Sequence, residues 1–385
     1  MLSKHATSVA STCVVVALLC ATTACASSAK HTTAGSAADV KVEAGQPFPS
    51  ARCAANRAVG QIRYVSGFDF AAAASIVDVL VAKQKGYFDA LCLDVVVQPG
   101  DSADDHALVA SGAAQFASSG SFSELVESAA TKSGAAPVAL AVEGQSAIDT
   151  LIVKSGGPTT LAGLRGAVIG VHSMITPSVQ AMLAKAGLVL GTDYTTKDLP
   201  GFDPTTNVAL AGIAAITGFQ SNEPGDLDRA GVTYSTFVPE SSGIPGSFGV
   251  IYSSAAFVKQ HPTAAEDFMR AAMQGLADAV ADPNAASMIA VDFIDNSGNP
   301  DQLSTDGERF RWQTESKLVV DGTPSGAPLG LPVAAGLKRE VDAYAKIGMF
   351  HGKAPKITAL YDTRVLGAIY DSTNHVIWPA KALSP

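Results

Sequence analysis

The stretch that decides the fold is residues 61–98, QIRYVSGFDFAAAASIVDVLVAKQKGYFDALCLDVVVQ. Its first five residues are typical of a buried strand, and residues 71–83 of an apolar helix that follows a short turn. A second strand is expected at residues 93–98, where consecutive valines suit a strand that is covered on both faces. This unit of strand, turn, helix and strand predicts a parallel sheet with helices on its faces.

The same alternation continues along the chain. Further strands are expected at residues 115–117, 138–142, 149–154, 167–171 and 249–252. Helices are expected at residues 102–111, 122–130, 160–164, 176–186, 263–281, 284–294, 307–320 and 334–348. In residues 263–281 the apolar side chains recur at steps of three and four, which predicts a packed amphipathic helix.

Length and composition limit the classes of protein to consider. The chain has 385 residues, which exceeds the usual size of a domain with a single hydrophobic core. Two lobes are therefore expected. Hydrophobic residues make up 47% and charged residues 16%, which indicates a globular and not a disordered chain. The formal net charge is −9, and Lys and Arg form no cluster. Composition therefore gives no reason to expect a nucleic acid partner.

Residues 1–24 have the features of a signal peptide. Lys4 precedes a mostly apolar run, residues 9–19, that is too short to cross a bilayer as a helix. Residues 21–25, ATTAC, resemble the lipobox of bacterial lipoproteins. Acylation of Cys25 would anchor the protein to the cell membrane, with its domain on the outer side. Their second residue departs from the usual Leu, so ordinary cleavage, giving a secreted or periplasmic protein, stays an alternative. Cys20 is a second candidate for the lipid.

The remaining N-terminal part predicts a tether and a disulfide. Residues 26–46 are rich in Ala, Ser, Thr and Gly without periodicity, which is typical of a flexible tether. After Cys25 only Cys53 and Cys92 remain, and an even pair in an exported chain predicts a disulfide. The bridge would tie the N-terminal arm to the strands that follow each cysteine. Two isolated cysteines do not predict a metal site, and no cofactor is expected.

Three motifs resemble one family of solute-binding proteins. Lys85-Gly86-Tyr87-Phe88 followed by Leu93-Asp94-Val95 resembles the family's early motif, Asn222-Glu223-Pro224 its mid-chain motif, and Phe257 to Pro262 its helix junction. The family binds sulfonates, nitrate and the pyrimidine precursor of thiamine, and the resemblance covers roughly residues 57–300. It implies two α/β lobes of the type II periplasmic-binding kind with a helical C-terminal portion. It also implies a monomer that delivers a small solute to an ABC permease.

The family fold also implies how the chain divides. Its two crossovers between lobes are expected near residues 149–154 and 246–252. The expected parts are the signal peptide at 1–24, the tether and arm at 25–56, lobe 1 at 57–150, lobe 2 at 151–245, and the return to lobe 1 with the C-terminal helices at 246–385.

In open α/β sheets, ligands bind beyond the carboxyl ends of the strands, so the loops there supply the candidate site. The ligand-binding candidates are Phe68, Asp69, Phe70, Ser121, Phe122 and Glu143 in lobe 1, and His172, Ser173, Thr176, Asn222 and Glu223 in lobe 2. These loops hold aromatic rings and acids without Lys or Arg, which favours a neutral or cationic heterocycle such as an aminopyrimidine. Hinge closure of the lobes would bury it.

Each candidate also has a structural alternative. The phenylalanines could pack in the core, Asp69 could cap a helix, and Glu223 could compensate a helix dipole. Glu143 could be a solvated hinge residue and His172 a structural histidine. Trp312 is expected in the core.

Three rival functions also stay open. A small anion could bind at a helix N-terminus beside Ser121 or Ser173. The chain could be a pyrimidine-synthase-like enzyme, but the Cys-rich motif of such an enzyme is missing from the sequence. It could also be an extracellular lipoprotein that binds a protein partner.

Overall fold

The computed structural model describes residues 40–131, 134–298 and 304–380. The predicted signal peptide, Cys25 and most of the predicted tether lie outside the described residues. None of the helices in the described part of the chain combines the length and the apolar character that a membrane span needs.

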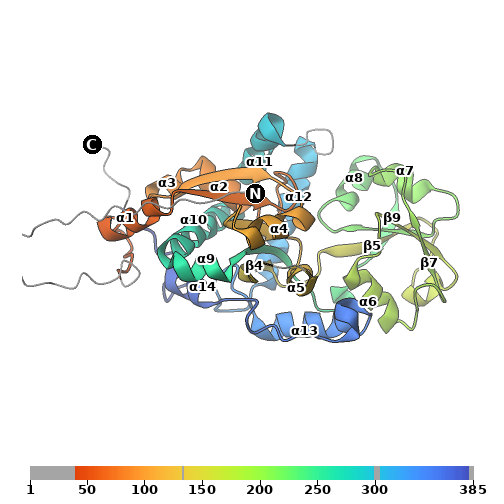
Figure 1. Ribbon diagram of the computed structural model, residues 1–385. Helices are drawn as coiled ribbons and strands as arrows, with labels where there is room; N and C mark the ends of the chain where they lie inside the picture. The colour runs from red at the N-terminus through yellow and green to blue at the C-terminus, as the bar shows by residue number, and fades with distance from the viewer. Residues whose placement is uncertain (1–39, 132–133, 299–303, 381–385) are drawn as a thin grey trace, which may run out of the picture. The chain divides into compact units, whose positions relative to one another are not determined.

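The first sheet is mixed, with its strands in the order β2-β1-β3-β10-β4 (Figure 1). Its strands are β1 (Gln61–Ser66), β2 (Asp94–Pro99), β3 (Phe116–Ser119), β4 (Pro137–Gly144) and β10 (Phe248–Ser254). β1 pairs in parallel with β2 and β3, as the sequence predicts. β10 is antiparallel to both of its neighbours, because it enters the sheet on the chain's return from the second lobe.

The second sheet has the order β7-β6-β8-β5-β9. Its strands are β5 (Asp149–Lys154), β6 (Val168–Val171), β7 (Thr195–Asp198), β8 (Ala215–Phe219) and β9 (Tyr234–Phe237). The expectation of a crossover at residues 149–154 is wrong, because β5 pairs along its length with β8 and β9. The chain instead passes between the sheets at residues 145–148 and 238–247. Similarly, most of the second expected crossover is part of β10.

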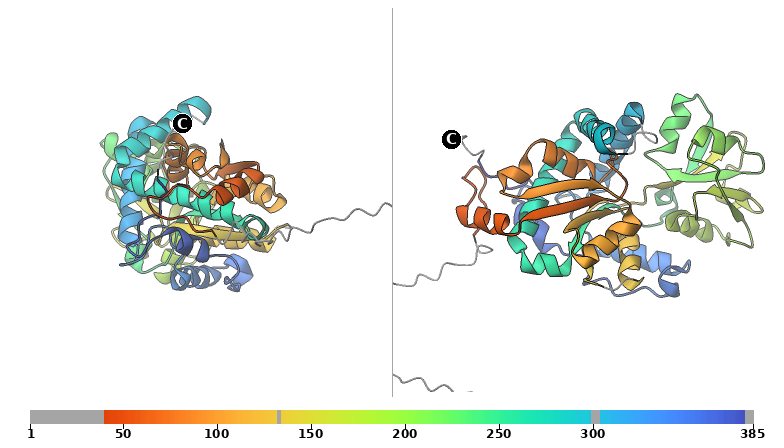
Figure 2. Two further views of the ribbon diagram at one scale, coloured as in Figure 1. Left: turned by 90° about the vertical axis from the view of Figure 1, so that its left-hand side faces the viewer. Right: turned by 45° about the horizontal axis from the view of Figure 1, so that its top comes forward.

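Helices surround both sheets (Figures 1 and 2). Those before β5 are α1 (Ser50–Ala58), α2 (Val77–Gln84), α3 (Tyr87–Ala90), α4 (Ser102–Ser111) and α5 (Phe122–Thr131). Those of the second lobe are α6 (Pro177–Lys185), α7 (Pro204–Ala209) and α8 (Glu223–Arg229). Those after β10 are α9 (Ala255–Gln260), α10 (Pro262–Ala281), α11 (Pro283–Ser297), α12 (Thr305–Gly322), α13 (Ala334–Ala345) and α14 (Arg364–Ile369). The predicted helical C-terminal portion is thus confirmed.

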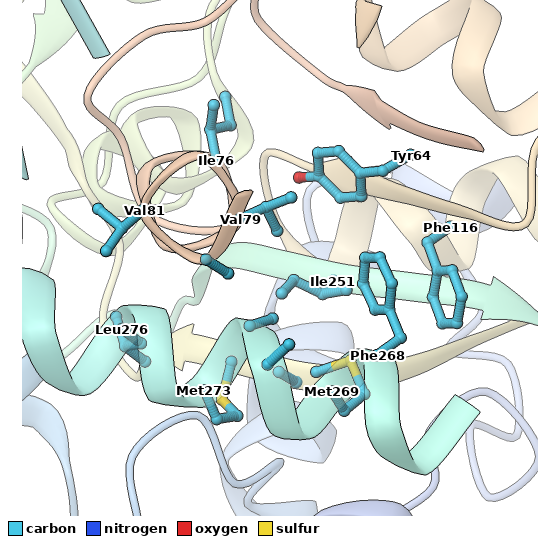
Figure 3. Packing of buried hydrophobic residues seen from close by; sticks show 14 of the residues in the cluster. Tyr64, Ile76, Val79, Val81, Phe116, Ile251, Phe268, Met269, Met273 and Leu276 are labelled. Carbon is cyan, nitrogen blue, oxygen red and sulfur yellow. The ribbon is translucent and has the colours of Figure 1, made fainter. Parts of the chain in front are cut away.

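One face of the first sheet packs against α2 and α10. Phe116 of β3 stacks on Phe268 of α10, with ring centroids 3.8 Å apart and an interplanar angle of 6° (Figure 3). Trp312 is fully buried in the same cluster, as expected, and its indole N–H donates to the carbonyl of Ala279 at 2.8 Å. A second cluster runs from the other face of this sheet into the second lobe, where α13 packs against both α5 and α6.

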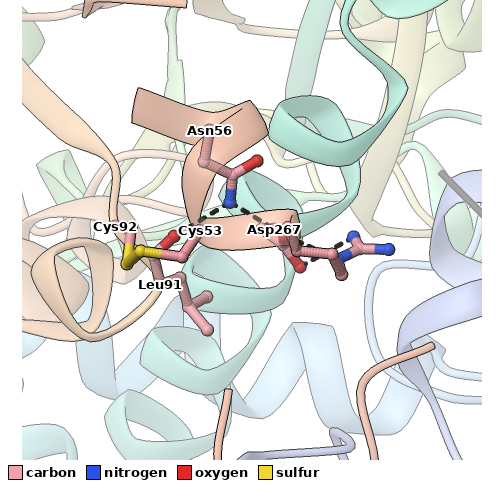
Figure 4. Close-up of a disulfide and its surroundings, with 6 residues drawn as sticks. Cys53, Asn56, Leu91, Cys92 and Asp267 are labelled. Carbon is pink, nitrogen blue, oxygen red and sulfur yellow. Dashed lines mark hydrogen bonds and ion pairs between the residues drawn. A yellow bond between two sulfur atoms is a disulfide. The ribbon is translucent and has the colours of Figure 1, made fainter. Parts of the chain in front are cut away.

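The predicted disulfide between Cys53 and Cys92 is confirmed (Figure 4). It joins α1 to the turn that precedes β2, and the two Cα atoms lie 5.1 Å apart. Beside it, the side-chain amide of Asn56 donates to the carbonyl of Leu91 and to the carboxylate of Asp267, both at 2.9 Å. These bonds fix α1 against α10 and the start of β2.

The prediction of a helix from residue 71 is wrong in its first turn and a half. α2 begins at Val77, and residues 71–76 form an irregular loop in which Ser75 has a φ of +65°. Backbone N–H groups that a helix would leave free at its N-terminus are bound here by buried carboxylates from distant parts of the chain. The sequence around residue 71 gives no indication of these distant carboxylates.

Candidate functional site

The turn after β1 is the first part of the candidate site. A Cβ on Gly67 would lie 2.6 Å from Oγ of Ser102 and 2.9 Å from the carbonyl oxygen of Ser118, so only glycine fits where β1, β3 and α4 meet. The next residue, Phe68, is 44% exposed although it is a large apolar ring. The turn therefore holds an aromatic face toward solvent at the carboxyl end of β1.

Three buried carboxylates hold the loop that follows. The N–H groups of Ala72, Ala74 and Ser75 donate to Glu308 (2.5 Å), Glu315 (2.7 Å) and Glu143 (2.9 Å), respectively. Two of these acids come from α12 and the third from the end of β4. These three hydrogen bonds from backbone N–H groups fix the position of the β1–α2 loop.

α12 also contacts the second lobe. Oε1 of Glu315 accepts a hydrogen bond from Oγ of Ser221 at 2.8 Å, and Arg311 donates from Nη2 to Oδ1 of Asn222 at 3.0 Å. The guanidinium carbon of Arg311 lies 5.6 Å from the ring centroid of Phe68. Arg311 thus brings together a residue that follows β1 in the first sheet and one that follows β8 in the second.

Further aromatic and apolar side chains lie at the carboxyl ends of the second lobe's strands. His172, just after β6, stacks on Phe202, which follows β7, with centroids 4.6 Å apart. Met174 and Phe202 are 70% and 69% exposed, and Phe219 at the end of β8 is 45% exposed. Partial burial lowers the pKa of His172, which keeps its imidazole neutral at pH 7. Ser173 and Thr176 belong to this same loop, Ser173 with a φ of +67°.

Other predicted ligand residues lie away from solvent. Phe70 is 1% exposed and meets Phe293 edge to face, and Phe122 is fully buried beside Tyr361. Ser121 accepts the N–H of Glu124 at 3.2 Å, a contact that satisfies the first turn of α5. In this structure the two phenylalanines pack in the interior and Ser121 stabilises the start of α5.

The acids that favoured a hydrogen-bond-donating ligand are largely occupied. Glu143 is fully buried, and Glu223 accepts the N–H of Phe219 at 2.7 Å and the side-chain amide of Asn222 at 3.3 Å. Burial raises the pKa of both carboxyls, and the charge of Asp78 raises that of Glu143 further. Burial and the charge of Asp101 raise the pKa of Asp69. Asp69 caps no helix, because α2 begins eight residues later.

Sequence reasoning missed the cation of this site. The loops themselves carry no Lys or Arg, but Arg311 reaches them from α12. A signal was present, since Glu308, Arg311 and Glu315 recur at steps of three and four and so share one face of α12. Such a charged stripe is equally typical of a solvated helix face, and its burial is visible only in the fold.

A separate groove of about 860 Å³ lies in the first lobe. It is lined by α9, the start of α10 and residues 358–365, and its charged residues are Lys259, Glu266, Asp362 and Arg364. None of the predicted ligand residues lines it. The described residues also contain no group of three or more His, Cys, Asp or Glu that could hold a metal ion.

Comparison with known proteins identifies the family. The family model described as NMT1/THI5 like matches residues 73–286, more than half of the chain. The chain therefore belongs to the NMT1/THI5-like family, and the resemblance that its motifs suggest is confirmed.

Two of the solved structures that share this fold are sulfonate-binding proteins. A putative periplasmic sulfonate-binding protein SsuA from Methylobacillus flagellatus KT superimposes with a TM-score of 0.57 at 15% identity, over 80% of this chain and 93% of that one. The alkanesulfonate-binding protein SsuA from Xanthomonas axonopodis pv. citri, bound to MOPS, gives 0.54 at 15% identity, over 83% and 98%. The predicted two-lobed α/β fold is thus confirmed.

One curated relative is similar in sequence over a shorter stretch. The riboflavin-binding protein RibY of Chloroflexus aurantiacus is 31% identical over 133 residues. The match spans 34% of this chain and 37% of that protein's length.

Proposed function

We propose that this protein is the extracytoplasmic substrate-binding component of an ABC importer. It captures a small, flat heterocyclic solute where the carboxyl edges of its two sheets meet, and closure of the lobes around that solute is the signal that the permease recognises. The protein performs no chemistry on the solute, because capture and release are sufficient for transport. It acts as a monomer.

The observation that carries this proposal is the exposure of large apolar side chains at strand ends. Phe68, Met174, Phe202 and Phe219 are each at least 44% exposed, and each follows or ends a parallel strand at the edge where α/β folds bind ligands. Exposed apolar surface is costly in water, and Phe68 in the first lobe together with Met174, Phe202 and Phe219 in the second suits an aromatic solute.

The riboflavin-binding relative supports the same chemical class. Riboflavin carries a flat tricyclic ring that includes a fused pyrimidine, the ring type that the composition of the loops favours. Rings of this kind stack on phenylalanine faces such as that of Phe68.

A small anion is the second candidate, and Arg311 is the observation that favours it. A guanidinium beside an exposed loop can bind a sulfonate or nitrate oxygen. Glu308 weighs against it, since its ion pair with Arg311 offsets the positive charge that an anion needs.

A titration of the exported domain separates these candidates. Riboflavin, lumichrome, 4-amino-5-hydroxymethyl-2-methylpyrimidine, ethanesulfonate and nitrate are each added while heat release and the thermal midpoint are followed. We expect a heterocycle to bind with micromolar or lower Kd. Phe68→Ala should weaken this binding about 10-fold, whereas Val320→Ala, an exposed apolar residue on α12, should not. Binding of ethanesulfonate or nitrate alone would refute the heterocycle.

Membrane anchoring through Cys25 is a further part of the proposal. An acylated Cys25 would anchor the N-terminus in the membrane, and the residues between it and residue 40 would connect that anchor to the domain near its permease. Fractionation of cells that express the full chain tests it. Wild-type protein should sediment with membranes and the Cys25→Ala variant should be released, and equal release of both would exclude the lipid.

A further inference from the structure

We propose that Arg311 is the residue that orients the solute, by donating hydrogen bonds to a ring carbonyl of a heterocycle stacked beside Phe68. This inference rests on the proposed function and narrows the solute class. Instead of an aminopyrimidine, the preferred solute carries its acceptor oxygens on the ring, as the pyrimidinedione edge of a flavin does.

Arg311 is held in place but is not saturated. Its side chain is 8% exposed, and its five N–H donors make a single hydrogen bond within the described structure, from Nη2 to Asn222 at 3.0 Å. Nε forms an ion pair with Oε1 of Glu308 at 3.4 Å. No hydrogen bond joins Nη1 to another described residue. The two N–H groups of Nη1 can therefore donate to a solute.

The surroundings of Arg311 select an uncharged acceptor. Glu308 lies beside its Nε, and Glu315 lies one turn further along the same face of α12. The ion pair with Glu308 offsets the charge of the guanidinium without occupying Nη1. A neutral carbonyl oxygen can therefore accept from Nη1, while a full anion would also face the carboxylate of Glu308.

The geometry also fixes the plane of the solute. The guanidinium carbon of Arg311 is 5.6 Å from the ring centroid of Phe68, and that ring is 44% exposed. A flat solute that covers the free part of the ring brings its edge within reach of the guanidinium. Aromatic stacking and a directed hydrogen bond then act on the same molecule.

The hydrogen bond from Arg311 to Asn222 of the second lobe makes the position of the guanidinium depend on closure of the lobes. Asn222, which holds Nη2, follows β8, while Phe68 follows β1. A solute bound to Arg311 thus contacts a group that is positioned by both lobes. Removal of the guanidinium should therefore affect solute affinity more than it affects the folded state.

The test compares variants of α12 by calorimetric titration with lumichrome, a neutral dicarbonyl heterocycle, and with 4-amino-5-hydroxymethyl-2-methylpyrimidine, which has no ring carbonyl. Arg311→Gln and Arg311→Lys should weaken lumichrome binding by 10- to 100-fold and leave the aminopyrimidine affinity within about 3-fold. Arg309→Gln is the matched control, because Arg309 is 45% exposed on the same helix, and it should bind lumichrome as the wild type does. The thermal midpoint of each unliganded variant checks folding.

The possible outcomes distinguish the two proposals. If wild-type protein binds lumichrome and both Arg311 variants bind it equally well, the inference is wrong while the proposed function stands. Should no heterocycle bind the wild type, the proposed function is wrong and the inference falls with it. Arg311-dependent binding of ethanesulfonate alone also overturns the inference, because the acceptor is then an oxyanion.

Discussion

Buried carboxyl groups are concentrated behind the candidate site. Asp78 and Glu143 are fully buried side chains of neighbouring elements, and Glu315 joins the β1–α2 loop to Ser221 of the second lobe. Burial raises the pKa of Asp78 and of Glu315 to about 7, and it raises that of Glu143 well above its usual range. Between about pH 4 and pH 7 these groups hold protons in the folded state that they lose in the unfolded state.

This arrangement predicts that acid stabilises the protein over a defined range. Because the pKa values of Asp78 and Glu315 are raised on folding, their contribution is fully present below about pH 4 and is lost as the pH rises through about 7. Each such group should lower the free energy of unfolding by about 1.4 kcal/mol per pH unit within that range. Urea unfolding at pH 5, 6, 7 and 8 measures the slope.

Asp78→Asn isolates one group. Its slope should be shallower than that of the wild type, and its free energy of unfolding at pH 8 should be higher, since no buried charge has to form. Asp306→Asn is the control, because Asp306 is 71% exposed on α12. Identical pH slopes for Asp78→Asn and the wild type would show that Asp78 does not titrate in this range.

Helices and strands whose bounds depend on neighbouring residues can be predicted from the sequence. Those whose bounds depend on residues far along the chain cannot. β5 has the predicted bounds, and α4 also spans its predicted residues, because apolar periodicity and flanking turn residues define them. α2 begins six residues late because Glu308, some 236 positions away, binds the N–H of Ala72. For the same reason the sequence indicated the strand-end loops of the site but not Arg311.

The disulfide stabilises the N-terminal elements. It closes a loop with a sequence separation of 39, so its removal should lower the free energy of unfolding by about 2–4 kcal/mol through the greater freedom of the unfolded chain. The double variant Cys53→Ser, Cys92→Ser in urea unfolding measures this. Its solute affinity should be unchanged, because α1 takes no part in the candidate site. A loss below about 0.5 kcal/mol would show that the bridge adds little.

Contact between α8 and α12 depends on a glycine. A Cβ at Gly225 would lie 2.4 Å from the ring of Phe310, so Gly225→Ala should cost about 1–3 kcal/mol and weaken solute binding by displacing α12. Gly367→Ala is the matched control, since its Cβ would meet no atom within 4 Å and its helical backbone suits alanine. Chemical denaturation and lumichrome titration check both variants. Equal stability of the two variants would mean that the helices adjust freely.

In the whole molecule, the two lobes are linked by more than the two chain crossings. α12 bonds to the loop after β1 and to Ser221 and Asn222 of the second lobe, while α13 packs on helices of both. Helices that follow the return strand therefore form part of the contact between lobes. The rule that ligands bind beyond the carboxyl ends of strands therefore indicates the loops of the site but not α12, which joins them.

Hydrogen exchange with and without saturating riboflavin shows which parts of the two lobes the solute protects. Binding between the lobes predicts slower exchange in residues 67–76, 172–176 and 219–223 and in α12 together, because the solute and closure protect both sheet edges. Protection confined to one lobe, or to the groove formed by α10 and residues 358–365, would contradict capture between the lobes.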